Sequence, residues 1–343
     1  MCNSMSDKKI LVTGGAGYIG SHTVLKLLEA NKSLIVFDNF SNSNESVIDR
    51  IRQIKDGDLK VIKGDITDRS LVKKIFKEYN IDSVIHFAGL KAVRESELFP
   101  IKYYKNNVLG SLILFEEMDL AGVKTIVFSS SATVYGEHSF SKYDENTPLR
   151  PVNVYGKTKK VIEDILQDIH KTKTDWRIMI LRYFNPIGAH SSGKIGDNPT
   201  DYPNNLMPFI SQVAIGKRSK LLVFGNNYPT PDGTGKRDYI HVEDLAEAHL
   251  KALNFLIQNK NIKKILNIGT GNSYSVLEVV KAFEKATKVK IPFQFVNRRD
   301  GDVAECYSDT HKAKNLLAWE PKFDLKRMCK DAWRWQCQNP NGI

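Results

Sequence analysis

The chain has 343 residues, of which 41% are hydrophobic and 26% charged, as in ordinary globular proteins large enough for two domains. Fifty Lys and Arg residues against 39 Asp and Glu give a formal net charge of +11, but the basic residues are spread along the chain without a basic tail or block. This pattern argues against nucleic-acid binding and favours a small anionic ligand such as a dinucleotide.

The four cysteines, Cys2, Cys306, Cys329 and Cys337, form no C-x-x-C pair and have no histidine at ligand spacing. We therefore expect no metal site and no disulfide framework. Scattered thiols fit a reducing compartment, and the first nine residues contain no apolar signal segment. Since no run approaches the roughly 20 apolar residues that cross a bilayer, we expect a cytoplasmic protein without a membrane segment.

In the first half of the chain, short apolar runs alternate with segments of helical length. We predict strands at residues 10–12, 34–37, 61–62, 84–87, 126–128 and 178–181, and helices ending near residue 29 and spanning about 71–79 and 101–120. Continuous apolar strands separated by helices are typical of a parallel sheet covered on both faces. The fold class is therefore α/β, a doubly wound Rossmann sheet.

The composition changes after residue 185. Residues 186–236 are rich in Gly, Pro, Asn and Asp and hold one clear helix, at about 206–215. A helix over about 242–256 and a strand at 265–268 restore the α/β pattern. We expect a Rossmann domain over residues 1–185, to which a segment of about 238–270 returns, and a smaller α/β domain over residues 186–343.

A glycine-rich turn follows the first strand directly and opens a helix, which is the context of a dinucleotide-binding motif. Gly14, Gly17 and Gly20 have the spacing G-x-x-G-x-x-G, with Tyr18 and Ile19 between the last two. Glycines let the turn tighten and let backbone N–H groups approach a pyrophosphate. A glycine-rich turn without a ligand would give the same letters.

Asp38 separates these two interpretations, because it closes the second strand 18 residues after Gly20. An acid at that place meets the adenosine ribose hydroxyls and repels a 2′-phosphate, so NAD is favoured over NADP. The alternative is a plain turn begun by Asp38 and Asn39.

Two further loops follow strands whose carboxyl ends would face the same ligand. Asp65 and Ile66 are placed to reach the adenine. Phe87, Ala88, Gly89 and Lys91 should pass beside the pyrophosphate and the nicotinamide ribose. A loop without a ligand remains an alternative for Asp65.

Tyr155 and Lys159 are four residues apart and share one face of a predicted helix, after a strand that ends in serines, including Ser131. Oxidation of a hydroxyl needs a general base, and free tyrosine, with a pKa of about 10, is too weak an acid for neutral pH. The cationic Lys159 and a positive nicotinamide ring would lower that pKa, and Ser131 would hydrogen-bond the substrate oxygen. A solvent-facing Tyr–Lys pair is the alternative.

The sequence around these residues closely resembles the UDP-glucose 4-epimerase family. The resemblance is carried by residues 86–93 (HFAGLKAV), 129–136 (SSSATVYG), 155–159 (YGKTK), 181–186 (LRYFNP), 203–208 (PNNLMP), 233–242 and 333–336, and it extends from residue 9 to about 336. It implies reversible interconversion of UDP-galactose and UDP-glucose through a 4-keto sugar, with NAD held throughout, by a homodimer packed through two long helices of the first domain.

The resemblance also implies roles for single residues. Tyr155 is the base, Lys159 tunes it and holds the nicotinamide ribose, Ser131 assists, and Lys91 and Asn106 line the cofactor side. Substrate contacts would come from Asn185, Asn205, Leu206, Phe224 near the uracil, Arg237 and Arg299 on the diphosphate, and Asp302 on the uridine ribose. Cys306 aligns where some bacterial enzymes carry a bulky tyrosine, which implies room for an N-acetyl group, unless Cys306 is only a buried core thiol.

Three other functions fit the sequence less well. A 4,6-dehydratase would carry an Asp-Glu pair after the catalytic Ser or Thr, whereas Ala132 and Thr133 follow Ser131. A decarboxylase would need groups that receive a glucuronate carboxylate, and no such set is recognisable. A non-catalytic NAD-binding regulator would not require both Tyr155 and Lys159.

Overall fold

The computed structural model describes residues 8–199, 203, 205–299 and 301–343. A large parallel sheet of seven strands forms its centre, in the order β11-β7-β5-β4-β1-β2-β3. These strands are β1 (Lys9–Thr13), β2 (Leu34–Asp38), β3 (Leu59–Lys63), β4 (Ile81–His86), β5 (Thr125–Ser131), β7 (Arg177–Tyr183) and β11 (Lys263–Ile268).

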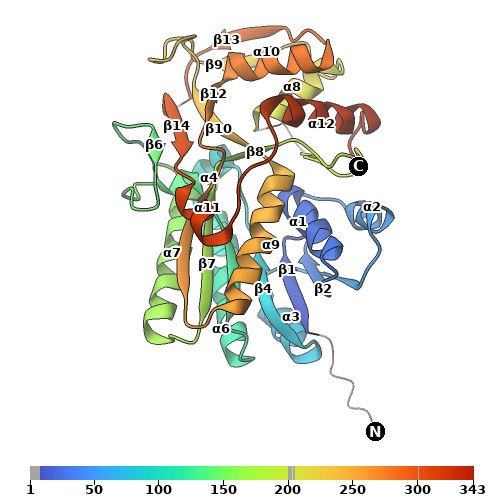
Figure 1. Ribbon diagram of the computed structural model, residues 1–343, viewed down its shortest axis with the longest axis vertical. Coiled ribbons are helices and arrows are strands. Elements are labelled where there is room, and N and C mark those ends of the chain that lie inside the picture. Colours follow the sequence, from blue (N-terminus) through green and yellow to red (C-terminus); the bar gives the residue numbers. More distant parts are fainter. Residues whose placement is uncertain (1–7, 200–202, 204, 300) are drawn as a thin grey trace.

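Helices cover both faces of this sheet (Figure 1). They include α1 (Tyr18–Glu29), α2 (Ser46–Ile54), α3 (Arg69–Glu78), α4 (Val93–Leu98), α5 (Pro100–Tyr103), the π-helix η1 (Tyr104–Leu109), α6 (Gly110–Leu120), α7 (Val154–Thr172), α9 (Val242–Gln258) and α11 (His311–Leu317), with a short 3₁₀ turn, η2 (Ala132–Val134).

Alternation along the strands explains the two covered faces. Val12 and Val36 pack into a cluster with residues of α1 and α9, whereas their neighbours Leu11 and Ile35 pack into a second cluster with α3, α6 and α7. A strand buried on both faces needs apolar residues at consecutive positions, and all five residues of β2 are buried. The predicted doubly wound α/β fold is confirmed.

A smaller lobe lies beyond the carboxyl ends of the large sheet and gathers α8, α10 and α12 (Figure 1). Its strands are β6 (Lys142–Tyr143), β8 (Asn185–Ile187), β9 (Leu221–Phe224), β10 (Lys236–His241), β12 (Ser273–Ser275), β13 (Phe293–Val296) and β14 (Glu305–Ser308), and its helices are α8 (Leu206–Ala214), α10 (Val276–Thr287) and α12 (Leu325–Gln338). In the smaller lobe, β10 pairs with β8, β12 and β14, while α9 and β11 follow it back to the large sheet.

The helix predicted over residues 101–120 is interrupted. The structure divides it into α5, η1 and α6, with a π-turn between Tyr104 and Leu109. The wide turn carries Asn106 and Asn107, whose side-chain oxygens accept hydrogen bonds from the Leu90 amide at 3.2 and 2.8 Å. The irregularity therefore ties this helix to the loop after β4, as π-turns near functional sites often do. Among the described helices, none is both long and apolar enough to cross a bilayer.

Candidate active site

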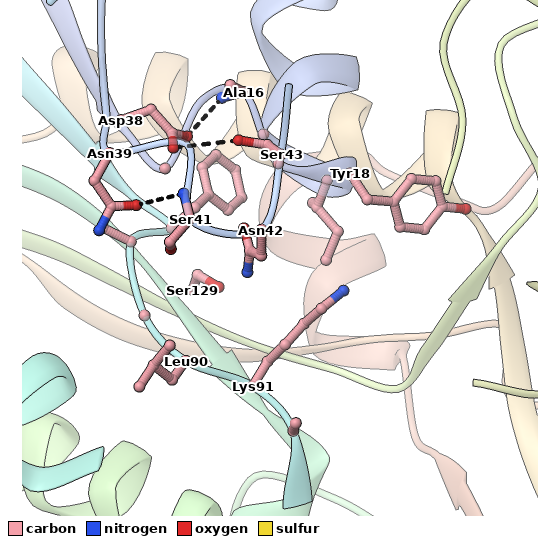
Figure 2. A pocket seen from close by; sticks show the side chains of 18 of the residues that line it. Ala16, Tyr18, Asp38, Asn39, Ser41, Asn42, Ser43, Leu90, Lys91 and Ser129 are labelled. Carbon is pink, nitrogen blue, oxygen red and sulfur yellow. Dashed lines mark hydrogen bonds between the residues drawn. The ribbon is translucent and has the colours of Figure 1, made fainter. Parts of the chain in front are cut away.

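A cavity of about 590 Å³, which we call the main cavity, opens at the carboxyl ends of β1, β2, β4 and β5. Crevices at this edge of a doubly wound sheet are the usual ligand site. Figure 2 shows Asp38, Asn39 and Ser43 on one wall, with Leu90 and Lys91 across from them. The volume is in the range of small-molecule and cofactor sites.

The glycine loop forms the floor of the main cavity. Gly14 has φ +68°, and a Cβ there would lie 2.6 Å from the Ala88 amide nitrogen. A Cβ on Gly20 would lie 2.2 Å from the Gly14 carbonyl oxygen, whereas one on Gly17 would meet that oxygen only at 3.4 Å. Gly14 and Gly20 are thus required by close backbone packing, and Gly17 leaves the start of α1 open.

The start of α1 is suited to an anion. Gly17 is its N-cap, and among the described residues no side chain caps it. Tyr18 and Ile19 follow in the first turn, and all three line the main cavity. Unpaired N–H groups at a helix N-terminus bind phosphate well, so the loop fits the pyrophosphate of a dinucleotide.

Asp38 ends β2 in a nearly buried position and is held by the backbone. Its carboxylate accepts hydrogen bonds from the Ala16 amide at 2.9 Å and the Ser43 hydroxyl at 3.4 Å (Figure 2). It also accepts one from the Phe40 amide at 2.8 Å. Burial raises the pKa of Asp38, and the amides of Phe40 and Ala16 oppose that shift. The carboxylate is therefore fixed at the cavity wall.

The predicted adenine-side residues also meet at the main cavity. The Asn39 side-chain amide donates to Asp65 at 2.8 Å, and Ile66 lines the cavity beside them. Hydrogen bonds from Thr67 and Asn39 lower the pKa of Asp65, against the effect of burial. Asp65 is consequently an ionised anchor for the loop rather than a free side chain.

The predicted residues after β4 line the opposite wall. Phe87, Ala88, Gly89, Lys91 and Asn106 all border the main cavity, and Lys91 is exposed to it.

Tyr155, Lys159 and Ser131 come together where β5 meets α7. The Asn153 side chain caps α7 by accepting from the Gly156 amide at 2.8 Å, which sets Tyr155 in the first turn. The Lys159 ammonium donates to the Ser129 carbonyl at 2.8 Å and lies 6.0 Å from the centroid of the Tyr155 ring. The Ser131 side chain lowers the pKa of Tyr155, and its hydroxyl accepts hydrogen bonds from the Thr133 amide and hydroxyl at 3.2 and 3.0 Å.

Burial changes the acidity of both titratable groups. It raises the pKa of Tyr155 to about 12, against the lowering effect of Ser131. It lowers the pKa of Lys159 to about 8, and the negative charge of Glu163 opposes that shift. The pKa of Tyr155 is therefore about two units higher than the value of about 10 for free tyrosine, because desolvation disfavours the tyrosinate.

Tyr183 and Ser129 are among the cavity residues to which the sequence assigned no role. Tyr183, at the end of β7, lines the main cavity, and its hydroxyl donates to the Ser129 hydroxyl. Ser129 borders the cavity as well. Tyr183 precedes Asn185 by two residues at a strand end and lies in the 181–186 motif, and these are the sequence signals that could have found it.

Most of the predicted substrate residues form a second group, in the smaller lobe. The Arg299 guanidinium lies 3.8 Å from the centroid of the Phe224 ring, and Arg237 ion-pairs with Asp302 at 3.4 Å. Arg237 also faces Cys306 directly in the β10–β14 register. We call these five residues the arginine cluster; they do not border the main cavity.

Three predicted substrate residues lie outside the arginine cluster. Asn205 borders the main cavity, Leu206 begins α8, and Asn185 begins β8 with its side chain exposed. Asn204, in the same motif, lies outside the described residues.

Cys306 is buried in a small apolar cluster beside Arg237. The residue is 8% exposed and packs with Val134, Tyr135, Tyr143 and Phe184. Burial raises its pKa to about 12, so the thiol is neutral and unreactive near neutral pH.

Comparison with known proteins identifies the family. The protein-family model described as GDP-mannose 4,6 dehydratase matches residues 11–332. The UDP-glucose 4-epimerase of Bacillus subtilis is 54% identical over 97% of this chain and 98% of its own length, and that of Pasteurella multocida is 55% identical over the same shares. A UDP-glucose 4-epimerase from Bifidobacterium longum, solved with NAD+ and UDP, superimposes with a TM-score of 0.95 at 45% identity, covering 98% of this chain and all of that one.

A second solved enzyme, from Stenotrophomonas maltophila, holds NAD and formylated UDP-arabinopyranose; it has a TM-score of 0.94 and 46% identity, and the match covers 96% of this chain and 98% of that one. Sequence identity of this size over nearly the full length of both chains shows membership of the same family and not only a common fold. The chain belongs to the UDP-glucose 4-epimerase family of extended short-chain dehydrogenases/reductases.

Proposed function

We propose that this protein interconverts UDP-galactose and UDP-glucose by oxidising and re-reducing C4 of the sugar, with NAD as resident cofactor. The observation that carries the proposal is the meeting of Tyr155, Lys159 and Ser131 beside a cavity built for a dinucleotide. The C4 hydrogen is not acidic, so inversion of that centre needs transient oxidation rather than simple deprotonation.

The main cavity fits NAD. The open N-terminus of α1 and Gly17 would bind the pyrophosphate, Asp38 the adenosine ribose, and Lys159 the nicotinamide ribose. When bound, NAD supplies the hydride acceptor that later returns the same hydride to C4. We infer that this cofactor domain comprises residues 1–185 with about 238–270, and that residues 186–343 otherwise bind the nucleotide sugar.

Tyr155 would take the proton of the 4-hydroxyl, and Ser131 would hold the oxygen during that transfer. Bringing a pKa of about 12 down to neutrality requires about 7 kcal/mol of preferential stabilisation of the tyrosinate. One ammonium at about 6 Å supplies roughly 3 kcal/mol at an effective dielectric of 20. Lys159 therefore needs the second positive charge of an oxidised nicotinamide, which makes Tyr155 a base mainly when the cofactor can accept hydride.

The arginine cluster would bind the UDP end of the substrate. Arg237 and Arg299 present guanidinium forks, which suit a diphosphate. Phe224 would lie near the uracil and Asp302 near the uridine ribose, while Asn185, Asn205 and Leu206 connect the cluster to the main cavity. This arrangement would point the sugar toward Tyr155.

Cys306 supports activity on UDP-N-acetylgalactosamine and UDP-N-acetylglucosamine as well. It is a small residue facing Arg237, so it leaves space where a tyrosine would fill it. Cys306→Tyr should lower turnover of the N-acetyl sugars at least tenfold more than turnover of UDP-galactose; a steric cost of about 1.4 kcal/mol suffices for that ratio. Equal losses for both substrate classes would reject this assignment.

We also propose a homodimer in the cytoplasm. Large apolar side chains are exposed along α4, α5, η1 and α6, with Ile101 72% and Leu98 65% exposed. Exposed apolar residues gathered on one face mark an interface. Ile101→Glu should convert a dimer to a monomer in sedimentation; a monomeric parent protein would contradict the proposal. The scattered thiols fit a reducing compartment.

The proposed chemistry is tested by running the reaction in D2O. Hydride held by the cofactor does not exchange with solvent, so UDP-glucose formed from UDP-galactose should carry no deuterium at C4. Deuterium at C4 would show deprotonation at carbon and contradict the redox route. Tyr155→Phe should lower kcat by about 10²–10⁴ if Tyr155 is the base.

A further inference from the structure

Glu163 is a buried carboxylate one helical turn beyond Lys159 on the same face of α7. It has no exposed surface. Arg182, on β7, binds it through two nitrogens, with Nη2 to Oε2 at 2.6 Å and Nε to Oε1 at 3.0 Å. The Ser130 hydroxyl donates to Oε1 at 2.5 Å. Glu163 is therefore a fixed, fully hydrogen-bonded anion beside the candidate catalytic groups.

The end of β5 and the face of α7 are in register. Three consecutive serines each hold one side chain of α7: Ser131 meets Tyr155 through its hydroxyl, Ser129 meets Lys159 through its carbonyl, and Ser130 meets Glu163 through its hydroxyl. Residues spaced by four lie on one face of a helix, so the three contacts form one seam between the helix and the strand. Loss of the last contact would loosen the first two.

We propose that Glu163 is a positioning residue of this active site: held by Arg182 and Ser130, it keeps α7 in register on β5 and places a buried negative charge one helical turn from Lys159. This inference rests on the proposed function for its catalytic meaning. It assigns Glu163 no direct contact with substrate or cofactor.

The groups around Lys159 support the electrostatic part. They are Tyr155 and Glu163 on α7, His86 on β4, and Tyr183 and Arg182 on β7. Burial lowers the pKa of His86 to about 3 and raises the pKa of both tyrosines, so these three are neutral near pH 7. The charge of Glu163 raises the pKa of Lys159 against burial. Without that charge, less of Lys159 would be protonated at neutral pH.

Stability alone does not account for this ion pair. Burying two charges costs desolvation, and a buried pair is often no more stabilising than apolar residues of equal volume. An apolar pair would leave Lys159 without a buried anion.

The test compares Glu163→Gln with Glu163→Asp in the NAD-loaded protein. Tyrosinate absorbance is followed against pH, with Tyr155→Phe in each background subtracted, and the pH profile of kcat is measured alongside. Removing the charge should lower the pKa of Lys159 by about one unit, the size expected for one partly screened charge within a helical turn. With less of the ammonium present, the pKa of Tyr155 should rise, so the tyrosinate curve and the acidic limb of the kcat profile should both move to higher pH. Glu163→Asp keeps the charge, so its curves should not move.

Asp164→Asn is the matched control. It removes a carboxylate from the next position of α7, where Asp164 pairs at 2.7 Å with Lys160 on a partly exposed face. Its curves should coincide with those of the parent protein.

Glu163→Gln leaves Arg182 buried without its partner, so thermal unfolding is measured for each variant. If Glu163→Gln does not fold, the double variant Glu163→Gln with Arg182→Gln should shift the curves in the same direction by a smaller amount, because loss of the positive Arg182 partly offsets loss of the negative Glu163. Curves of a folded neutral variant that match the parent would overturn the inference. The absorbance titration needs no turnover, so it stays readable even if the epimerase proposal fails.

Discussion

Acid sensitivity of the fold follows from its buried histidines. Burial lowers the pKa of His22 and His86 to about 3 and that of His249 to about 4. In the unfolded chain each would titrate near 6.5. Below that pH the unfolded chain binds protons at these histidines and the folded protein does not. Their contribution to the free energy of unfolding is therefore fully present above pH 6.5 and is lost as the pH falls toward 4.

The magnitude can be worked out for the step from pH 7 to pH 5.5. Each histidine loses about 1.3 kcal/mol of folding free energy over that step, so the three together lose about 4 kcal/mol. This is a large part of the 5–15 kcal/mol that typical folded proteins possess. The pKa of His190 is lowered as well, and it acts in the same direction.

Urea unfolding at the two pH values tests this estimate. His249→Asn should reduce the loss between pH 7 and 5.5 by about 1.3 kcal/mol, because one such histidine is gone. His311→Asn is the control, since the His311 side chain is 79% exposed. Equal pH dependence in the parent protein and His249→Asn would refute the reasoning.

Three further outcomes follow from the site. Gly20→Ala should weaken NAD binding at least tenfold by titration, about 1.4 kcal/mol, since the new methyl would lie 2.2 Å from the Gly14 carbonyl; unchanged affinity would contradict the packing argument. Asp38→Asn should raise affinity for NADP relative to NAD by about tenfold, because the repelling charge is removed. An unchanged ratio of the two affinities would contradict the proposed contact between Asp38 and the adenosine ribose. Ser131→Ala should move the acidic limb of the kcat profile to higher pH, since its hydrogen bond lowers the pKa of Tyr155; no movement would remove Ser131 from the proton path.

The cofactor half of the fold was readable because its signals are local. Gly14, Gly20 and Asp38 occupy fixed distances from strand ends, and backbone packing allows few other residues there. The pairing of Tyr155 with Lys159 follows from helical spacing.

Other features depend on long-range packing that no local pattern carries. The π-turn around Asn106 arises from hydrogen bonds to Leu90, far from it in sequence. The short strands of the smaller lobe have too few residues for a period of two to stand out. From the sequence alone, Glu163 would be expected on the exposed face of a helix. Its burial depends on Arg182, which lies on a neighbouring strand and binds its carboxylate.

The burial of Tyr155 depends on the same kind of long-range packing. The sequence identifies Lys159 as a nearby cation, but it does not reveal that Tyr155 is desolvated enough to raise its pKa to about 12.

The most direct test of the central claim is NMR of the purified protein with UDP-galactose and no added NAD. The account predicts that UDP-glucose appears, because the cofactor remains bound through purification and is restored in each cycle. If no UDP-glucose forms even after NAD is supplied, the epimerase assignment is contradicted.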